Sequence, residues 1–446
     1  MIAPARAAAF EILLQVSYTD AHSDELLRSA AIDRLSAQDR ALVTTLVLGT
    51  LRWQIKLDAL IRPLLARPGV TLAPVVETAL RLGAYQLLYL DRIPAHAAIG
   101  ESVELVKRAG ERFASGMVNA VLRKLAKVTL PEARTPGSPP QLAETYAHPL
   151  WMVERWASAY GLHAAESICR FDQEPSGISL RLLHPEAETS LREEGVELVA
   201  GEFLVDARRV VCGDVVRSRA FREGWVRIQD EGSQMVAELA GHGMRILDVC
   251  AAPGGKAAIL AERNPEALVT AQDASRRRLE AMQRWMLRGG KVEFAVQDAT
   301  VMQLRPEYDL ILCDVPCTGT GTMGRNPEIR SRVSAGEIAR QRMRQVKILR
   351  ASLAGLATGG RLLYATCSLE PEENEAVIAE CTASLPGFYV TPLNDETARL
   401  ESEGIVHRDG VARLREHAVR DGFLRTIPGI VACDGFFAAL IRRDSE

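Results

Sequence analysis

The sequence contains no long hydrophobic run, although 47% of its 446 residues are hydrophobic. A membrane-spanning helix needs about 18 or more consecutive apolar residues, so we expect none. The first residues include Arg6 and Glu11 and lack the apolar core of a secretory signal. Eight cysteines lie scattered along the chain, unlike the framework of a small disulfide-rich secreted protein. We therefore expect a protein of the reducing cytoplasm.

Neither strong net charge nor internal repetition marks the chain, whose formal net charge is -3. Basic residues are nevertheless unevenly placed, because residues 107–127 contain six of them and a single acid, Glu111. Residues 338–369 contain six basic residues and no acid. Local basic faces can hold phosphates even in a slightly acidic protein. Ordinary solvated helix faces have a similar composition, so charge alone leaves both interpretations open.

Alternating β-branched residues are nearly absent from residues 1–130, where apolar residues recur at helical spacing. We predict an all-helical domain over residues 1–130, with helices at 4–16, 38–65, 74–90, 97–108 and 115–127. Five prolines then indicate a linker over residues 131–149. A helix at 151–160 and strands at 178–182 and 209–212 predict a small α/β subdomain over residues 150–227.

Strands and helices alternate in residues 228–446. The predicted strands are 245–249, 268–272, 292–296, 310–313, 361–364 and 436–441, and the predicted helices include 256–263, 275–288 and 337–356. This alternation is typical of a parallel sheet with helices on both faces. Ligands of such sheets bind at the carboxyl ends of the strands.

A glycine turn follows the first of these strands, with the sequence Cys250-Ala251-Ala252-Pro253-Gly254-Gly255-Lys256. Glycines admit a ligand close to the backbone, and the following helix N-terminus favours its polar end. The turn matches neither the Walker loop nor the dinucleotide motif. Asp273 ends the next strand, where an acid accepts hydrogen bonds from ribose hydroxyls. Asp298 follows the third strand and is placed to bind an adenine amino group, although either aspartate is also a suitable helix N-cap.

Two cysteines stand at the ends of later strands, in Asp314-Val315-Pro316-Cys317 and in Thr366-Cys367-Ser368. Glycines 319, 321 and 324 predict a mobile loop after Cys317. A helix expected near Pro371 would lower the pKa of the Cys367 thiol. The other cysteines are interpreted as structural, and no metal site is expected because the cysteine spacing lacks a second ligand pair. These structural cysteines are Cys169, Cys212, Cys250, Cys313, Cys381 and Cys433.

Two cysteines beside a cofactor turn suggest methyl transfer to a pyrimidine carbon. Carbon 5 of cytosine is a poor nucleophile until a thiolate adds at carbon 6. An acid such as Asp314 must hold or protonate N3, and a second group must help to remove the carbon 5 proton. The base must also be unstacked or single-stranded. Chemistry alone leaves the order of Cys317 and Cys367 open, since a Pro-Cys dipeptide carries the nucleophile in DNA cytosine-5 methyltransferases.

The chain resembles the bacterial ribosomal RNA cytosine-5 methyltransferases of the Sun/Fmu type, which carry a NusB-like N-terminal domain. The resemblance covers essentially the whole chain. The matching segments are 229–233, 247–256, 314–317, 325–329, 366–368, 371–374 and 434–437. Val315 and Thr318 depart from the usual alanine and serine, which affects loop packing rather than chemistry.

This resemblance implies an all-α NusB-like domain, a small α/β RNA-binding subdomain and a C-terminal Rossmann-like class I methyltransferase domain. It implies that Cys367 is the nucleophile and that Cys317 assists product release. S-adenosyl-L-methionine would be lined by Cys250 to Lys256, Asp273, Asp298 and Asp314. The implied partner is 16S ribosomal RNA. The alternatives are a transfer-RNA or DNA cytosine-5 methyltransferase, or a non-catalytic RNA-binding or antitermination protein, against which Asp314, Cys317 and Cys367 argue.

Overall fold

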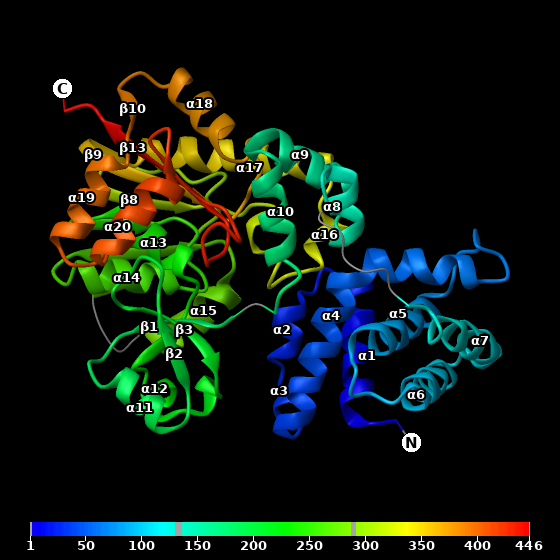
Figure 1. Ribbon diagram of the computed structural model, residues 1–446. Coiled ribbons are helices and arrows are strands. Elements are labelled where there is room, and N and C mark those ends of the chain that lie inside the picture. The colour runs from blue at the N-terminus through cyan, green and yellow to red at the C-terminus, as the bar shows by residue number, and fades with distance from the viewer. Residues whose placement is uncertain (1, 130–135, 176, 287–290, 446) are drawn as a thin grey trace. The chain divides into compact units, whose positions relative to one another are not determined.

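The computed structural model describes residues 2–129, 136–175, 177–286 and 291–445, which form two compact units (Figure 1). The helical unit comprises Met1–Pro175 and Met323–Arg332, and the sheet unit comprises Ser176–Thr322 and Val333–Glu446. Among the described residues, no helix is both long and apolar enough to cross a membrane.

The helical unit confirms the all-helical prediction for the N-terminal residues. Pro4 and Pro74 begin two of its helices, where a missing backbone N–H costs nothing. Apolar residues at helical spacing, such as Leu46, Leu80 and Leu122, are fully buried in its core. The helices are α1 (Pro4–Tyr18), α2 (Ser23–Leu27), α3 (Ala30–Asp33), α4 (Ala37–Ile61), α5 (Pro74–Tyr89), α6 (Ala95–Arg108) and α7 (Ser115–Leu125).

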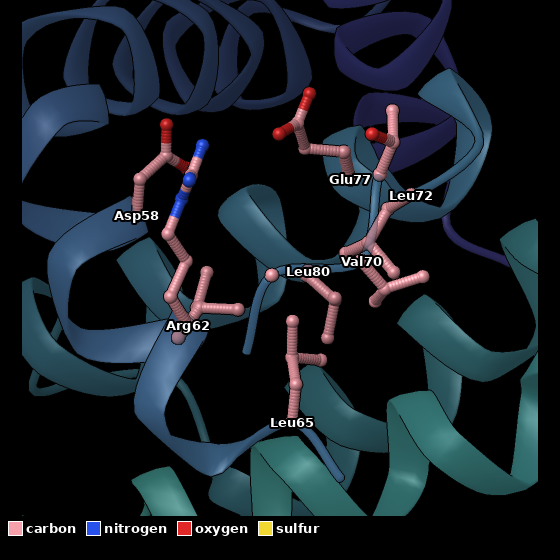
Figure 2. Close-up of a pocket in the computed structure, with 10 residues that line it drawn as sticks. Asp58, Arg62, Leu65, Val70, Leu72, Glu77 and Leu80 are labelled. Atoms are coloured by element: carbon pink, nitrogen blue, oxygen red, sulfur yellow. The ribbon is translucent and has the colours of Figure 1, made fainter. Parts of the chain in front are cut away.

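A cavity of about 140 Å³ lies in this unit between the end of α4 and the start of α5 (Figure 2). Leu65 and Leu80 line its apolar part. Its acids are already paired, because Asp58 accepts two 2.7 Å hydrogen bonds from Arg81 and Glu77 lies 3.1 Å from the same guanidinium. The cavity therefore lies within the helical packing, and Arg81 of the same unit balances the charge of its acids.

Three further helices belong to the helical unit. This unit therefore extends to Pro175, beyond the predicted boundary at residue 130 and into the predicted linker and subdomain. The three helices are α8 (Pro139–Thr145), α9 (Leu150–Tyr160) and α10 (Leu162–Phe171). Two of the five prolines that suggested a linker, Pro139 and Pro140, occupy the first turn of α8 instead. Trp156 and Ile168 are buried in this helical packing. Residues 131–135 of the predicted linker lie outside the described residues.

A short segment after the predicted Cys317 loop also belongs to the helical unit. It is Met323–Arg332, which contains helix α16 (Ile329–Arg332). Glu328 accepts 2.9 Å hydrogen bonds from the backbone N–H and the hydroxyl of Ser23. The buried Arg330 guanidinium donates to the backbone oxygens of Arg52, at 2.6 Å, and Asp172, at 3.0 Å. These contacts fix the segment within the helical unit.

The small sheet at the start of the sheet unit is antiparallel, in the order β2-β3-β1-β4. Its strands are β1 (Ser179–Leu182), β2 (Glu197–Ala200), β3 (Ala207–Cys212) and β4 (Val226–Ile228), with helices α11 (Ala187–Glu193) and α12 (Arg219–Arg222). Arg181 on β1 is fully buried and pairs with Glu238 at 2.9 Å and Glu262 at 2.7 Å. These ion pairs join the small sheet to helices α13 (Glu231–Ala240) and α14 (Gly255–Arg263).

The large sheet is mixed, in the order β11-β12-β13-β9-β8-β5-β6-β7, with β10 on β13. Its parallel part follows the prediction, and β13 lies antiparallel to β9. Both faces of β13 are buried, so its sequence is a continuous apolar run like that of a central parallel strand. For this reason the sequence did not indicate that β13 is antiparallel. The strands are β5 (Arg245–Asp248), β6 (Leu268–Asp273), β7 (Lys291–Val296), β8 (Tyr308–Asp314), β9 (Leu356–Thr366), β10 (Phe388–Thr391), β11 (Val419–Arg420), β12 (Phe423–Thr426) and β13 (Phe436–Arg443).

Helices pack on both faces of this sheet, as the alternating pattern predicted. Leu310 and Leu312 of β8 join the core that contains residues of α13 and α14, whereas Ile311 and Cys313 join the core that contains residues of α17 (Ala335–Ala354). The remaining helices are α15 (Arg276–Met286), α18 (Glu375–Ser384), α19 (Asn394–Ser402) and α20 (Arg408–Arg413). The part of the predicted helix 275–288 beyond Met286 lies outside the described residues.

Candidate active site

The glycine turn lies between β5 and α14, at the carboxyl edge of the parallel strands. Gly254 has a φ of 106°, and a Cβ there would lie 2.6 Å from Met282 and 2.8 Å from Trp285. A Cβ on Gly255 would lie 3.0 Å from Gln229. Glycine is therefore required at Gly254 by backbone conformation and by close packing, whereas at Gly255 a side chain would only have to displace the end of Gln229. The turn delivers the amide groups of the α14 N-terminus to this edge.

Asp273 ends β6 beside this turn and is nearly buried. Its Oδ2 accepts a 3.3 Å hydrogen bond from the Ala252 backbone N–H, and its Oδ1 accepts one of 2.8 Å from Ser275. Arg278 lies 3.8 Å from Oδ2 and also donates to the Ala252 carbonyl oxygen. Asp273 therefore shapes the turn and the start of α15 as well as offering a carboxylate at the predicted position.

Asp298 lies two residues beyond β7 and is exposed to solvent. Its carboxylate accepts 2.8 Å hydrogen bonds from the backbone N–H and the hydroxyl of Thr300. These bonds lower the pKa of Asp298. The structure thus gives this side chain a local turn-forming role, close to the N-cap alternative considered for it.

Asp248, the last residue of β5, was missed by sequence reasoning. It is buried, and neither carboxylate oxygen accepts a well-formed hydrogen bond. Burial, and next the charge of Asp314, raise the pKa of Asp248 to about 8. A polar residue at the end of the apolar run 245–249 was the signal that could have identified it. An unpaired carboxylate beneath the turn fits a ligand that carries positive charge.

Lys256 joins the turn to the end of β8. Its Nζ lies 2.8 Å from Oδ2 of Asp314. Burial alone would lower the pKa of Lys256, but the carboxylate of Asp314 and the thiolate of Cys367 outweigh it and the pKa is raised. The lysine therefore stays charged beside both groups. Cys250 and Cys313 are kept protonated, because burial raises their thiol pKa values, that of Cys313 to about 12.

The two predicted reactive cysteines meet at the ends of neighbouring strands. Cys317 follows β8, Cys367 follows β9, and their Sγ atoms lie 3.3 Å apart as free thiols. The interaction with Cys367, and next burial, raise the pKa of Cys317 well above its usual range. Cys317 therefore keeps its proton while it interacts with Cys367. Helix α18 begins at Glu375 rather than near Pro371. Lys256 interacts electrostatically with Cys367.

Of the three glycines after Cys317, Gly321 serves close packing between two loops. Gly321 donates a 2.9 Å hydrogen bond to the carbonyl oxygen of Cys367 and accepts one of 2.8 Å from Gly435. A Cβ on Gly321 would meet the Gly435 backbone at 2.2 Å. Of the cysteines interpreted as structural, Cys212 is exposed, contrary to the burial expected of it.

Comparison with known proteins identifies the family. A model of the 16S rRNA methyltransferase RsmB/F family matches residues 237–442, and the NusB family model matches residues 3–127. The probable ribosomal RNA small subunit methyltransferase B of Bacillus subtilis (strain 168) is 33% identical over 459 aligned residues, covering 98% of each chain. This chain belongs to the RsmB/F family. It is therefore an RNA methyltransferase that depends on S-adenosylmethionine.

Solved structures share the RsmB/F fold. The structure of PH0851 aligns with a TM-score of 0.81 at 24% identity and covers 99% of both chains. NSun6 from Pyrococcus horikoshii, solved with SFG, aligns with a TM-score of 0.56 at 18% identity, covering 67% of this chain and 98% of its own. In the RsmB/F protein described here, Asp314, Cys317, Cys367 and the glycine turn are brought together, whereas Asp298 is an exposed side chain engaged in its own turn.

Proposed function

We propose that this chain methylates carbon 5 of a cytosine in 16S ribosomal RNA through a covalent bond between Cys367 and carbon 6. The observation that supports this chemistry best is the 3.3 Å approach of the two thiols beside the glycine turn. A thiolate and a separate proton acceptor are what addition at carbon 6 and removal of the carbon 5 proton require. The name of the family and of the relative supports 16S ribosomal RNA as the substrate.

The cofactor site is proposed at the turn from Cys250 to Lys256, with Asp273 holding the ribose and Asp298 near the adenine. Asp314 supplies negative charge at this site, and a bound cation would favour the ionised form of Asp248, whose pKa is otherwise raised to about 8. When bound, S-adenosylmethionine supplies an electrophilic methyl group carried on a sulfonium. The carboxylates therefore favour the charged cofactor over its neutral-sulfur product.

The two thiols act in sequence. The Cys367 thiolate forms the bond to carbon 6, and Asp314, held by Lys256, contacts the N3 side of the base. Once Cys367 is bonded to carbon, its interaction with Cys317 is lost, and with it the main cause of the raised Cys317 pKa. Cys317 then releases its proton to water and accepts the one on carbon 5. The bond from Cys367 to carbon 6 breaks as the double bond re-forms.

RNA binding is proposed for the basic surface of α6 and α7. The six basic residues of 107–127 are all exposed, and among the described residues only Lys107 has a close acidic partner, Glu104 at 2.7 Å. The ring of Phe113 is fully exposed among them. Arginine and lysine neutralise phosphates, and an exposed ring offers a face to an unpaired base.

The test uses 16S ribosomal RNA whose cytosines carry deuterium on carbon 5, with transfer RNA as the competing substrate. We expect 5-methylcytidine in the ribosomal RNA, with one deuterium released to water for each methyl group added. Methylation that leaves every deuterium in place would assign the reaction to a nitrogen or ribose oxygen instead. Faster methylation of transfer RNA would overturn the substrate assignment.

A further inference from the structure

Glu373 lies between β9 and α18, and its side chain is fully buried. Its Oε1 accepts 2.9 Å hydrogen bonds from the Thr318 backbone N–H and from Nε2 of Gln345. Its Oε2 accepts from the hydroxyls of Thr318 and Ser368. One carboxylate therefore binds four donors, which uses the acceptor capacity of both oxygens.

These donors lie directly beside the two reactive cysteines. Thr318 follows Cys317 in the chain, and Ser368 follows Cys367. Gln345, on α17, also donates a 3.0 Å hydrogen bond to the carbonyl oxygen of Pro316, so it holds the other side of Cys317. One buried carboxylate and one buried amide thus join the segments that carry the two Sγ atoms, which lie 3.3 Å apart.

We infer that Glu373 is a positioning residue that holds the Cys317 loop against the Cys367 loop and so controls release of the methylated RNA. The inference rests on the proposed function for its link to release, whereas the positioning itself does not. Release requires Cys317 to reach the carbon 5 proton while Cys367 is still bonded to carbon 6. A Cys317 loop freed from Glu373 loses that alignment, although Cys367 can still attack.

The chain offers a substitution that separates geometry from charge. In Glu373→Gln, the amide oxygen can accept from Thr318 and Gln345, and the amide nitrogen can donate to the two hydroxyls, which rotate to accept. The side chain keeps its size and its bonds and loses its charge. Glu373→Ala loses all four bonds. Glu396→Ala is the matched control, because it removes another buried carboxylate, paired with Arg361 and Arg399, that contacts neither cysteine loop.

Thiol proximity is measured first, without RNA or cofactor. Diamide oxidises two neighbouring thiols to a disulfide and is itself reduced to the hydrazine, with both thiol protons transferred to it. Peptide mapping follows the disulfide between Cys317 and Cys367. We expect rapid formation in the wild type, Glu373→Gln and Glu396→Ala, and formation at least about tenfold slower in Glu373→Ala. Equal rates in all four proteins would overturn the positioning role.

Release is measured next, by denaturing electrophoresis after incubation with RNA and S-adenosylmethionine. Glu373→Ala should accumulate covalent RNA–protein adduct while turnover falls at least about tenfold, and Glu373→Gln should restore turnover. Loss of both adduct and turnover, or failure of glutamine to rescue, would contradict the inference. If Glu373→Ala slows the disulfide yet the wild type never passes through an adduct, the positioning role stands and the proposed function fails.

Discussion

Lys256 donates a 2.8 Å hydrogen bond to Asp314, whereas Asp248, which responds to the charge of both, accepts no well-formed hydrogen bond from the described residues. The ion pair anchors the cofactor turn to the strand that leads to Cys317. The charge of Lys256 offsets only part of the effect of burial and of Asp314 on the buried Asp248. A carboxyl group in this state costs folding stability when ionised, so its retention points to a charged ligand.

Asp248→Asn should therefore stabilise the protein in a pH-dependent way. The pKa of Asp248 is raised to about 8 in the folded state, so its stabilising proton is fully retained below its unfolded pKa and lost as pH rises through 8. The asparagine variant has no such loss. Urea unfolding should show its advantage growing by up to about 4 kcal/mol from pH 5 to pH 8 and then levelling, since one pKa unit is about 1.4 kcal/mol. An advantage that does not change with pH would contradict this account.

Asp273→Ala should weaken binding of S-adenosylmethionine by about 1–3 kcal/mol, the scale for losing charged hydrogen bonds. Asp273 also holds the Ala252 amide, so part of the loss comes from the turn itself. Asp273→Asn keeps the volume and one acceptor, and it should lose less. Calorimetry gives both affinities, and an unchanged value for the alanine variant would refute the assignment.

The ends of the strands could be predicted from the sequence because local patterns determine them. Asp273 and Asp314 are the last residues of apolar strands, and parallel strands bring their carboxyl ends to one edge. The spacing of apolar residues in the N-terminal helices likewise indicates which helix faces are buried. In these regions, residues close in the chain carry the structural information.

Contacts between distant residues were not predictable in the same way. Glu373 reads as one acid among several after Cys367, and only its burial against Thr318 and Gln345 gives it a role. The placement of 323–332 in the helical unit depends on residues about 300 positions earlier in the chain, such as Ser23. The local sequence around such a charged residue does not indicate which distant residue pairs with it in the fold.

That placement changes how RNA binding should be tested. Deleting residues 1–130 would remove Ser23 and Arg52, which hold Glu328, Gly324 and Arg330. Substitutions at the surface avoid this damage. Glutamine at the six exposed basic residues should weaken RNA binding. The slope of log affinity against log salt concentration should become shallower by about 0.7–0.9 for each lost phosphate contact. These residues are Lys107, Arg108, Arg112, Arg123, Lys124 and Lys127.

Filter binding at several salt concentrations measures that slope. Two exposed arginines outside this surface, Arg28 and Arg34, should leave it unchanged when replaced by glutamine. Binding of S-adenosylmethionine should be the same in all these variants. An identical salt slope after all six substitutions would show that the RNA lies elsewhere.

Phe113→Ala should weaken RNA binding by about 1–3 kcal/mol, the scale for losing a base stacked on an aromatic ring. Stacking releases no counterions, so the salt slope should stay as in the wild type. Phe113→Tyr preserves the ring face and should bind normally. A change in slope for the alanine variant, or equal loss in the tyrosine variant, would argue against stacking.

The two cysteines should separate in a trapping experiment. Cys367→Ala lacks the thiol that bonds to carbon 6, so no RNA adduct should form. Cys317→Ala keeps that thiol but lacks the group that promotes elimination, so it should add, methylate and then stall with RNA attached. The stalled species should survive denaturing electrophoresis and require both RNA and S-adenosylmethionine. An adduct in Cys367→Ala and none in Cys317→Ala would exchange the two roles and place this protein with the DNA enzymes, in which the cysteine after proline attacks.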